Sequence, residues 1–286
     1  MPKSPLTVYK ELQKLFTQDV KSMENGRLLT ETISASLDFL KKTRRVQLNS
    51  LVPNKGYFSF ELDRKSSRAV NEDIFVEDIR GWKEFLDSVG EVAKPHLDST
   101  KITKLIYSAA IAFCCYIDLT KDGDQKTPGT FFEYLIGHLF AKRLGINPTK
   151  QLDVLDLDIQ ATLPTDFIFN LGKEKPKFHL PVKTSSRERV IQVWAHQRVL
   201  DGVYGTGRFI GTPVILGETK SDKRKKEVIE ICLPDQWRIY QMHIAQLKRI
   251  YYLDVPAAYN KLNEVFPKIA VRPFGDFFRE VDALAQ

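Results

Sequence analysis

The sequence contains an aspartate and a lysine on either side of a short turn. Their types and spacing are those of candidate catalytic residues. Asp166 begins one apolar segment, and Lys183 ends the next one, after a Gly-Lys-Glu-Lys-Pro turn. An aspartate entering an apolar strand is costly unless it has partners. Because two strands joined by a turn bring residues to neighbouring positions, the spacing predicts that Asp166 and Lys183 share one face.

An acid and a lysine in one place are groups that the hydrolysis of a phosphodiester requires. This reaction needs a deprotonated water, neutralised charge on the transition state and a stabilised leaving oxygen. A hard divalent cation held by carboxylates can serve all three needs, and a lysine beside it can orient or polarise the water. A candidate site therefore needs two or three acids and a lysine on a common face.

These two segments resemble the core of the PD-(D/E)XK nucleases. Pro164-Thr165-Asp166 matches the first part of that motif, and Pro181-Val182-Lys183 matches the second part. The resemblance implies an enzyme that hydrolyses double-stranded DNA with Mg2+ as its cofactor and leaves a 5′-phosphate. It also implies that Asp166 binds the metal and that Lys183 is catalytic.

Pro181 stands where this superfamily normally has an acid, two residues before the lysine. Some restriction enzymes of the superfamily also lack that acid and supply one from the following helix. In this chain the following helix reads VIQVWAHQRVL and has no carboxylate. Gln192, His196 or Gln197 occupies the region where an acid is expected, so the residue that completes the metal site stays open.

A second match follows the lysine directly. After the spacer Thr184-Ser185-Ser186 comes Arg187-Glu188-Arg189, which resembles the signature of type II restriction enzymes that read CCGG, CCNGG or related sites. The resemblance implies that Arg187, Glu188 and Arg189 bind DNA and read C:G pairs. An arginine can bond guanine O6 and N7, and a carboxylate can accept a hydrogen bond from cytosine N4.

A third match lies upstream, in Gly129-Thr130-Phe131-Phe132-Glu133. It resembles the helix start that carries an extra active-site glutamate in the same family. The resemblance implies that Glu133 is catalytic and holds the metal together with Asp166. The residue type alone leaves a structural role open, because a glutamate near a helix N-terminus is also favoured by the helix dipole.

One competing motif is Glu218-Thr219-Lys220, which fits the literal E-X-K pattern at the end of a predicted strand. If this were the catalytic pair, the preceding acid could be Asp166 or Asp201. We prefer Lys183, because the competing motif adjoins the charged segment 220–226, which is typical of a solvated turn. That turn could also contact phosphates.

The elements that would position these residues follow from apolar spacing and turn residues. Residues 121–286 are predicted to form an α/β (α+β) nuclease core of the PD-(D/E)XK restriction-endonuclease-like kind. Its mixed central sheet would be flanked by helices. The predicted elements are a helix from Gly129 to Gly145, strands around Asp166 and Lys183, a helix from about Arg187, a strand pair around 220–226, and a long helix from about Gln236 to Tyr252.

Residues 1–120 are predicted to form a mainly helical region. Apolar residues at helical spacing over 6–45 predict two helices with a break near Asn25-Gly26. The segment 46–75 looks irregular. Helix returns over 76–118, with a break near Lys94-Pro95.

The bulk properties agree with a DNA-binding enzyme. The 286 residues carry a formal net charge of +7, and a basic balance favours a polyanionic partner, most often nucleic acid. The three cysteines lie in apolar runs, which predicts buried thiols in a reducing compartment. The sequence has no apolar signal core, and its longest apolar stretch is too short to span a bilayer. We therefore expect a cytoplasmic protein without a membrane partner.

Together these observations predict a type II restriction endonuclease of a restriction-modification pair that cuts a C:G-rich palindrome, CCGG-like or CC and GG with a spacer. Because a two-fold site calls for a two-fold protein, we expect a homodimer or a larger homo-oligomer. The helix predicted over Gln236–Tyr252 is one candidate interface. The alternatives are a catalytically silent sequence-specific DNA-binding protein, which the missing acid at Pro181 favours, and a repair-type nuclease on the same core.

Overall fold

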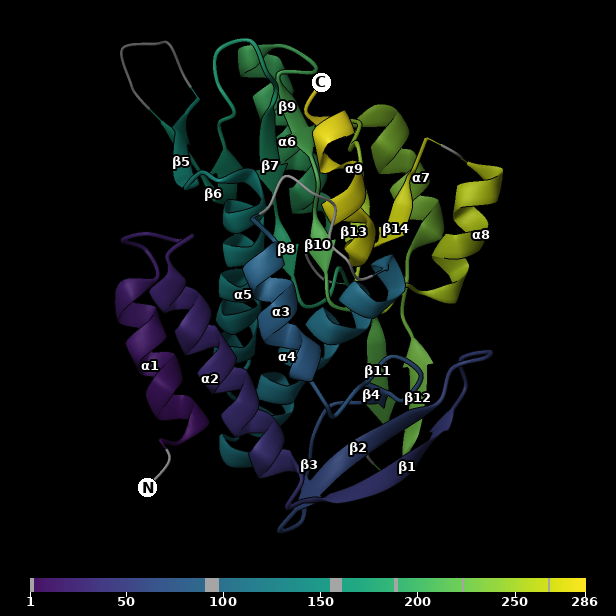
Figure 1. The fold of residues 1–286 in the computed structure, drawn as a ribbon. Coiled ribbons are helices and arrows are strands. Elements are labelled where there is room, and N and C mark those ends of the chain that lie inside the picture. Colours follow the sequence, from purple (N-terminus) through teal and green to yellow (C-terminus); the bar gives the residue numbers. More distant parts are fainter. Residues whose placement is uncertain (1–2, 91–97, 155–160, 188–189, 223, 267) are drawn as a thin grey trace.

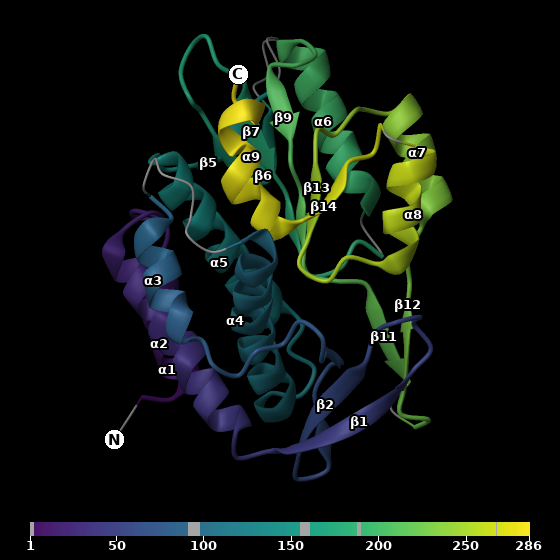
Figure 2. The same ribbon diagram turned by 45° about the vertical axis from the view of Figure 1, so that its right-hand side comes forward.

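The computed structural model describes residues 3–90, 98–154, 161–187, 190–222, 224–266 and 268–286. A central sheet with helices on both faces lies above a second sheet (Figures 1 and 2). The predicted class, a mixed α/β fold with a sheet flanked by helices, is confirmed.

The central sheet is mixed and is broken by two prolines. β5, β6 and β7 are antiparallel, β9 is parallel to β7, and β8, β10, β13 and β14 are parallel to their neighbours. Two backbone hydrogen bonds, Thr212 N to His179 O and Val214 N to Pro181 O, both 2.9 Å, continue the pairing across the breaks. The strands are β5 (Thr149–Asp153), β6 (Thr162–Phe169), β7 (Lys177–Leu180), β8 (Val182–Lys183), β9 (Phe209–Gly211), β10 (Val214–Ile215), β13 (Ile250–Tyr252) and β14 (Val271–Pro273).

The helices cover the two faces of this sheet in two groups. Alternation along the strands sends Val214 and Tyr251 into the larger core and Ile215 and Tyr252 into the smaller one. The larger core includes α1 (Pro5–Leu15), α2 (Met23–Leu40), α3 (Arg80–Ser88), α4 (Ser99–Thr120), α5 (Lys126–Leu144), η1 (Phe274–Asp276) and α9 (Phe277–Leu284). The smaller core includes α6 (Val190–Tyr204), α7 (Pro234–His243) and α8 (Ala257–Val265).

α4 is the central helix of the larger core. By length and composition it could cross a membrane, but 89% of its apolar window is buried inside the protein. Cys114 and Cys115 lie within it as buried free thiols, whereas the free thiol of Cys232 is half-buried. The prediction of free cysteines in apolar surroundings is confirmed for the α4 pair.

A second sheet replaces the irregular segment that the sequence predicted over 46–75, and that prediction is wrong. Its spatial order is β11-β12-β1-β2-β3, and β4 pairs with β2. β1 is antiparallel to β2 but parallel to β12. The strands are β1 (Arg44–Ser50), β2 (Tyr57–Leu62), β3 (Lys65–Ser66), β4 (Val70–Asn71), β11 (Thr219–Asp222) and β12 (Glu227–Glu230).

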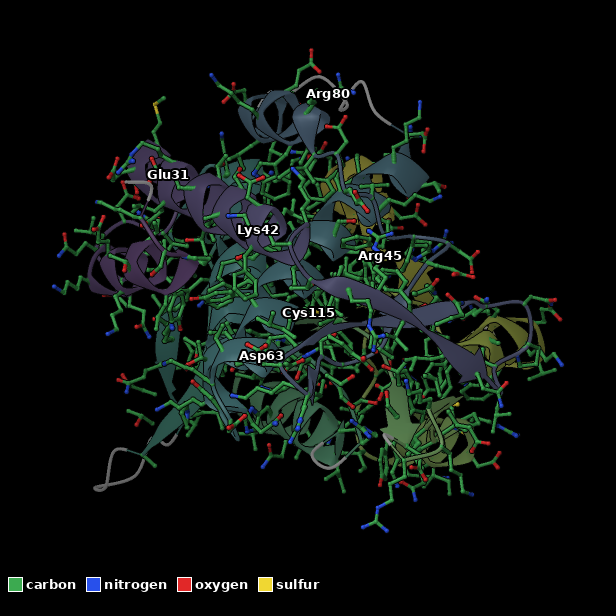
Figure 3. The ribbon with its side chains drawn as sticks, turned by 90° about the horizontal axis from the view of Figure 1, so that it is seen from below. Glu31, Lys42, Arg45, Asp63, Arg80 and Cys115 are labelled. Atoms are coloured by element: carbon green, nitrogen blue, oxygen red, sulfur yellow. The ribbon has the colours of Figure 1, made fainter. Side chains whose placement is uncertain are left out.

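The physical reason for this error is a turn without glycine. Asp63 and Arg64, between β2 and β3, both have positive φ angles of 47° and 68°. Such a pair gives a tight hairpin, for which Asn-Gly or Asp-Gly is the usual signal. Figure 3 views this sheet from below, with Arg45 on β1; its guanidinium lies 4.6 Å from the centre of the Phe58 ring.

Two helix predictions need correction. The break between α1 and α2 lies at residues 16–22, and Asn25 and Gly26 fall in the first turn of α2. Gly26 is a packing residue, since an added Cβ would lie 3.2 Å from Nε2 of His138. The helix predicted over Gln236–Tyr252 ends at His243, and Ile250–Tyr252 is a buried strand. The apolar residues of 250–252 therefore cannot form the candidate dimer interface.

The remaining elements follow the sequence more closely. α5 ends at the predicted cap, Gly145, which has a φ of 72°, but it begins at Lys126 rather than at Gly129. The predicted strand through Asp166 and the predicted hairpin around the charged tip are present as β6 and β11–β12. The predicted break near Lys94-Pro95 lies outside the described residues.

The free energy of unfolding is expected to depend on pH through His138 in α5 and His179 in β7. Both side chains are fully buried, and burial lowers the pKa of each imidazole to about 4 from the ordinary value of 6.5. Between these values the unfolded chain binds more protons than the folded chain. The stabilisation is therefore complete above pH 6.5 and is lost as pH falls towards 4, by up to about 3 kcal/mol for each histidine.

Urea unfolding at pH 7 and pH 5 measures this effect. We expect the free energy of unfolding to be about 2 kcal/mol lower at pH 5 for each histidine. In a His179→Gln variant the difference between the two pH values should be about half of the sum expected for His138 and His179, because only His138 remains to titrate. An unchanged difference between the two pH values in the variant would contradict the assignment to His179.

Candidate active site

The site is built around an ion pair between Lys183 and Asp166. Nζ of Lys183 lies 2.8 Å from Oδ2 of Asp166, and both side chains are partly buried. The backbone N–H of Val182 donates a second hydrogen bond, of 2.7 Å, to the same oxygen. The predicted juxtaposition of Asp166 and Lys183 on one face of the sheet is confirmed.

The register of the sheet explains both contacts. Phe167 in β6 lies opposite Leu180 in β7, so Asp166 lies opposite Pro181. Proline has no N–H to donate to the ladder, and the strand breaks there into β7 and β8. The next N–H, on Val182, bonds to the Asp166 carboxylate. Pro181 thus acts in this structure as a strand break that helps to orient Asp166.

Glu133 approaches the same place from α5. This helix packs along β6 and β8, and Gly137 lies one turn after Glu133 on the same helix face. A Cβ at Gly137 would lie only 2.5 Å from Cζ of Phe167, the neighbour of Asp166. The glycine is therefore needed for the close approach of helix and strand that places Glu133 beside the Asp166–Lys183 pair.

The electrostatics of Glu133 reflect this position. Burial raises the pKa of its carboxyl above the ordinary value, and the Asp166 carboxylate raises it further, whereas Lys183 and Lys150 lower it. Lys150 belongs to β5, and its ammonium lies 5.0 Å from the centre of the Phe167 ring. Two acids and two lysines are thus electrostatically coupled between α5 and the sheet.

Two neighbouring carboxylates are a partial fit for a hard divalent cation. A cation between Glu133 and Asp166 would relieve the repulsion that raises the pKa of Glu133. Both hydrogen bonds to Asp166 reach Oδ2, and no described residue donates to Oδ1. No group of three or more His, Cys, Asp or Glu side chains that could hold a metal occurs in the described part of the chain.

Helix α6 carries the three residues that occupy the region of the missing acid. Gln192 is exposed. Gln197 is buried and has its own partners: its Oε1 accepts from Nδ1 of His179 at 3.1 Å, and its Nε2 donates to Asp201 and to the carbonyl of Phe209, both at 3.0 Å. Gln197 is thus a packing residue of α6 rather than a free ligand.

His196 is the one of these three that is coupled to the site. Its imidazole is partly buried, and its ring lies 6.3 Å from that of His179. Burial lowers the pKa of His196, the Asp166 carboxylate raises it, and Lys183 lowers it. The sequence alone does not favour Gln192, His196 or Gln197 as the residue in place of the missing acid. The contacts of these side chains distinguish His196 from the two glutamines.

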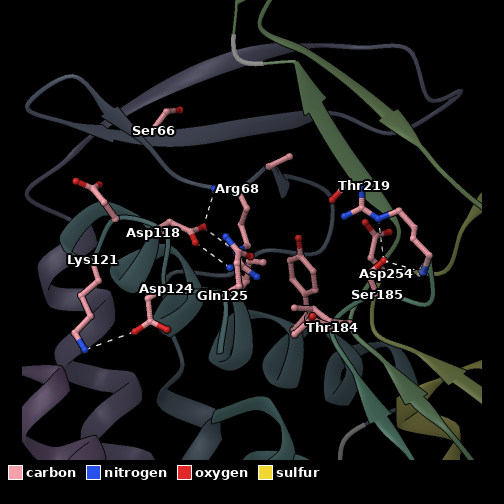
Figure 4. Close-up of a pocket in the computed structure, with 18 residues that line it drawn as sticks. Ser66, Arg68, Asp118, Lys121, Asp124, Gln125, Thr184, Ser185, Thr219 and Asp254 are labelled. Atoms are coloured by element: carbon pink, nitrogen blue, oxygen red, sulfur yellow. Dashed lines mark hydrogen bonds and ion pairs between the residues drawn. The ribbon is translucent and has the colours of Figure 1, made fainter. Parts of the chain in front are cut away.

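The residues after Lys183 border a polar cavity of about 340 Å³. Thr184 and Ser185 line it from the side of the central sheet, while Arg68 and Asp118 line it from the opposite side (Figure 4). Arg187 also lines it. Arg68 and Asp118 form a two-point ion pair, with Nε–Oδ2 and Nη2–Oδ1 distances of 2.7 and 2.9 Å. Glu188 and Arg189 lie outside the described residues.

Comparisons with known proteins add to this geometry. No family model matches the chain, and no curated protein matches it either. The crystal structure of Type IIP restriction endonuclease Kpn2I is similar to it with a TM-score of 0.82 and 25% sequence identity, covering 98% of this chain and 96% of that one. The fold is that of a type II restriction endonuclease. A restriction endonuclease PspGI-substrate DNA complex has a TM-score of 0.44 and 16% identity, over 71% of this chain and 87% of that one.

Within this restriction endonuclease fold, Glu218 is a buried residue, although it adjoins the charged tip that the sequence predicted to be solvated. Its side chain is 1% exposed, and it accepts hydrogen bonds from Ser186 N, Ser185 Oγ and Tyr252 Oη at 2.8–2.9 Å. Lys220, by contrast, is exposed on β11. Glu218 therefore contacts the loop after Lys183.

Sequence reasoning missed Gly137 and the contacts of Glu218. One available signal was the apolar run that ends just before Glu218, since a short apolar run bounded by turn residues is typical of a buried strand. The end of a buried parallel strand is a place where polar side chains from neighbouring strands meet. The sequence offers no comparable signal for Gly137, because its partner Phe167 belongs to a different element.

Proposed function

We propose that this chain is a site-specific endonuclease that cleaves double-stranded DNA by Mg2+-dependent hydrolysis. The observation that carries the proposal is the Asp166–Lys183 ion pair with Glu133 beside it, in a fold similar to a type II restriction endonuclease. Asp166 and Lys183 correspond to the first acid and the lysine of the PD-(D/E)XK motif, and Glu133 would supply a second acid where Pro181 replaces the one before the lysine.

In this proposal the carboxylates of Glu133 and Asp166 hold the cation. When bound, Mg2+ supplies charge neutralisation at the phosphate and lowers the pKa of water. The side chain of Lys183 is 32% exposed, so its ammonium can donate to the attacking water or to the scissile phosphate while Asp166 fixes its position. The products would carry a 5′-phosphate and a 3′-hydroxyl.

A plasmid digestion tests the proposal. The purified chain is incubated with a sequenced plasmid, with Mg2+ and with EDTA, and the fragment ends are sequenced. Discrete fragments whose ends share one sequence, formed only with Mg2+, would support it. Specific retention of DNA without cutting would instead favour the catalytically silent binding protein that Pro181 suggests, and unspecific degradation would favour another kind of nuclease.

Specificity is proposed to reside in Arg187, Glu188 and Arg189. Arg187 borders the polar cavity four residues after Lys183, so its guanidinium can reach base pairs adjacent to the scissile phosphate. Two arginines and a carboxylate suit two guanines and their paired cytosines, which favours a C:G-rich palindrome.

Arg187→Ala is expected to cost about 1–3 kcal/mol of discrimination between the recognised site and a site with one exchanged base pair. Cleavage and binding of both duplexes measure this difference. Arg224→Ala, at the exposed tip between β11 and β12, is the matched control. Loss of a phosphate contact there should weaken binding to every sequence and flatten its salt dependence. An Arg187→Ala variant with full sequence preference would rule out base reading by Arg187.

A homodimer or larger homo-oligomer is also proposed, because a palindrome has two-fold symmetry. The proposal does not depend on the segment Ile250–Tyr252, which is buried in the core. Light scattering of the free and DNA-bound chain measures the mass, and a monomer in both states would contradict it. A partner methyltransferase reading the same sequence would complete a restriction-modification pair.

A further inference from the structure

A buried carboxylate lies at the point where three parallel strands of the central sheet end. Glu218 follows β10, Ser185 and Ser186 follow β8, and Tyr252 is the last residue of β13. The strands are in register, with Ile215 opposite both Lys183 and Tyr252. Their carboxyl ends therefore meet at one edge.

The carboxylate of Glu218 accepts hydrogen bonds from three donors at this edge. Oε1 accepts from Ser186 N at 2.8 Å and from Tyr252 Oη at 2.9 Å, and Oε2 accepts from Ser185 Oγ at 2.9 Å. Glu218, Ser186 and Tyr252 are each less than 5% exposed. A buried carboxylate is costly to retain unless it is hydrogen-bonded, so this cluster fixes the loop after Lys183.

The hydroxyl of Ser185 links this carboxylate to Arg187. Its oxygen accepts hydrogen bonds from the backbone N of Arg187 at 3.3 Å and from its Nε at 3.0 Å. A serine hydroxyl has one proton and two lone pairs. Because the Ser185 hydroxyl donates its proton to Oε2 of Glu218, both lone pairs of its oxygen remain for Arg187. The relay therefore sets the direction in which the guanidinium leaves the loop.

We infer that Glu218 is a positioning residue for sequence discrimination, acting through the Ser185 hydroxyl on Arg187. The inference rests on the proposed function, in which Arg187 reads bases. It assigns a specificity role to the glutamate of the competing E-X-K motif, while Lys183 remains the catalytic lysine. The same anchor fixes the spacing between Lys183 and the reading residues, since Ser185 lies between them.

Ser185→Ala removes the relay and leaves Glu218 its bonds to Ser186 and Tyr252. We expect discrimination against a duplex with one exchanged base pair to fall about tenfold or more, the loss of a hydrogen bond to a charged group. The KM for the recognised duplex should rise more than kcat falls, because the chemistry at Asp166 is untouched. Ser185→Thr keeps the hydroxyl and should restore the discrimination, which a purely structural role would not predict.

A double-mutant cycle with Arg187→Ala tests whether Ser185 acts through Arg187. The double variant should discriminate no worse than Arg187→Ala alone, because the relay has nothing left to orient. Additive losses would overturn the inference. Glu218→Gln offers one oxygen to three donors, so it should lower discrimination in the same direction, and Ser185→Ala carries the test if that variant fails to fold.

Assays of the wild-type chain distinguish a failure of the inference about Glu218 from a failure of the proposed function. If the wild-type chain cuts at one sequence and Ser185→Ala keeps the full discrimination, the inference fails and the proposed function stands. If the wild-type chain neither cuts nor binds any sequence specifically, the proposed function fails and the inference fails with it.

Discussion

Lys183→Ala is expected to lower the rate of DNA cleavage roughly 10²–10⁴-fold while specific binding changes by less than about tenfold. In the proposed mechanism the lysine acts on the transition state, so its loss should affect the rate of the chemical step more than affinity. Single-turnover cleavage with Mg2+ measures the rate, and fluorescence anisotropy with EDTA measures binding.

The matched control for this prediction is Lys220→Ala, which removes the lysine of the competing E-X-K motif. Lys220 is exposed on β11, and its carboxylate neighbour in the motif is occupied by Ser185, Ser186 and Tyr252. Cleavage should therefore stay within a few-fold of wild type. The opposite pattern, an active Lys183→Ala and an inactive Lys220→Ala, would transfer the catalytic role to the competing motif.

Asp166→Ala is expected to abolish Mg2+-dependent cleavage. This carboxylate is proposed to bind the cation, and it also fixes Lys183 and accepts from Val182 N. Removing it leaves the cation under-coordinated and the lysine without its partner. Asp166→Asn, which keeps the shape but not the charge, should need a higher Mg2+ concentration for half-maximal cleavage, and a Mg2+ titration measures this.

Asp201→Asn serves as the control, because Asp201 is the other acid that the sequence allowed. It accepts a hydrogen bond from Gln197, one helical turn earlier in α6, and its loss should leave cleavage nearly unchanged. Glu133→Ala is expected to remove cleavage as well. If the Glu133→Ala variant cleaves DNA normally, Glu133 has only a structural role in α5, and another residue supplies the second metal ligand.

The Asp166–Lys183 ion pair could be predicted because its geometry is local. Asp166 and Lys183 lie on two strands joined by one turn, so alternation and register alone place them together. Their ion pair confirms that step. The contacts of Glu218 could not be predicted in this way, because its partners come from two other strands of a parallel sheet, whose register depends on long connections.

The segment after His243 could not be assigned from sequence for another reason. Strands buried on both faces read as continuous apolar runs, and such runs do not distinguish helix from strand. Ile250, Tyr251 and Tyr252 form such a run, and the structure buries all three between two layers of helices. These residues were too many for one apolar face of a helix. A parallel strand in the core requires them, because both of its faces are buried.

The parallel pairing of β1 with β12 affects when the second sheet can form during synthesis. β1 is made well before its neighbour β12, because α3 to α6 and the central strands β5 to β10 lie between them in the sequence. The polar cavity likewise combines Arg68 with Ser185 and Thr219. A nascent chain that has folded only its first helices therefore still has an unpaired edge at β1, and it lacks the residues that line the cavity from the side of the central sheet. The second sheet and the polar cavity are therefore complete only after the segment that holds Thr219 and β12 has been made.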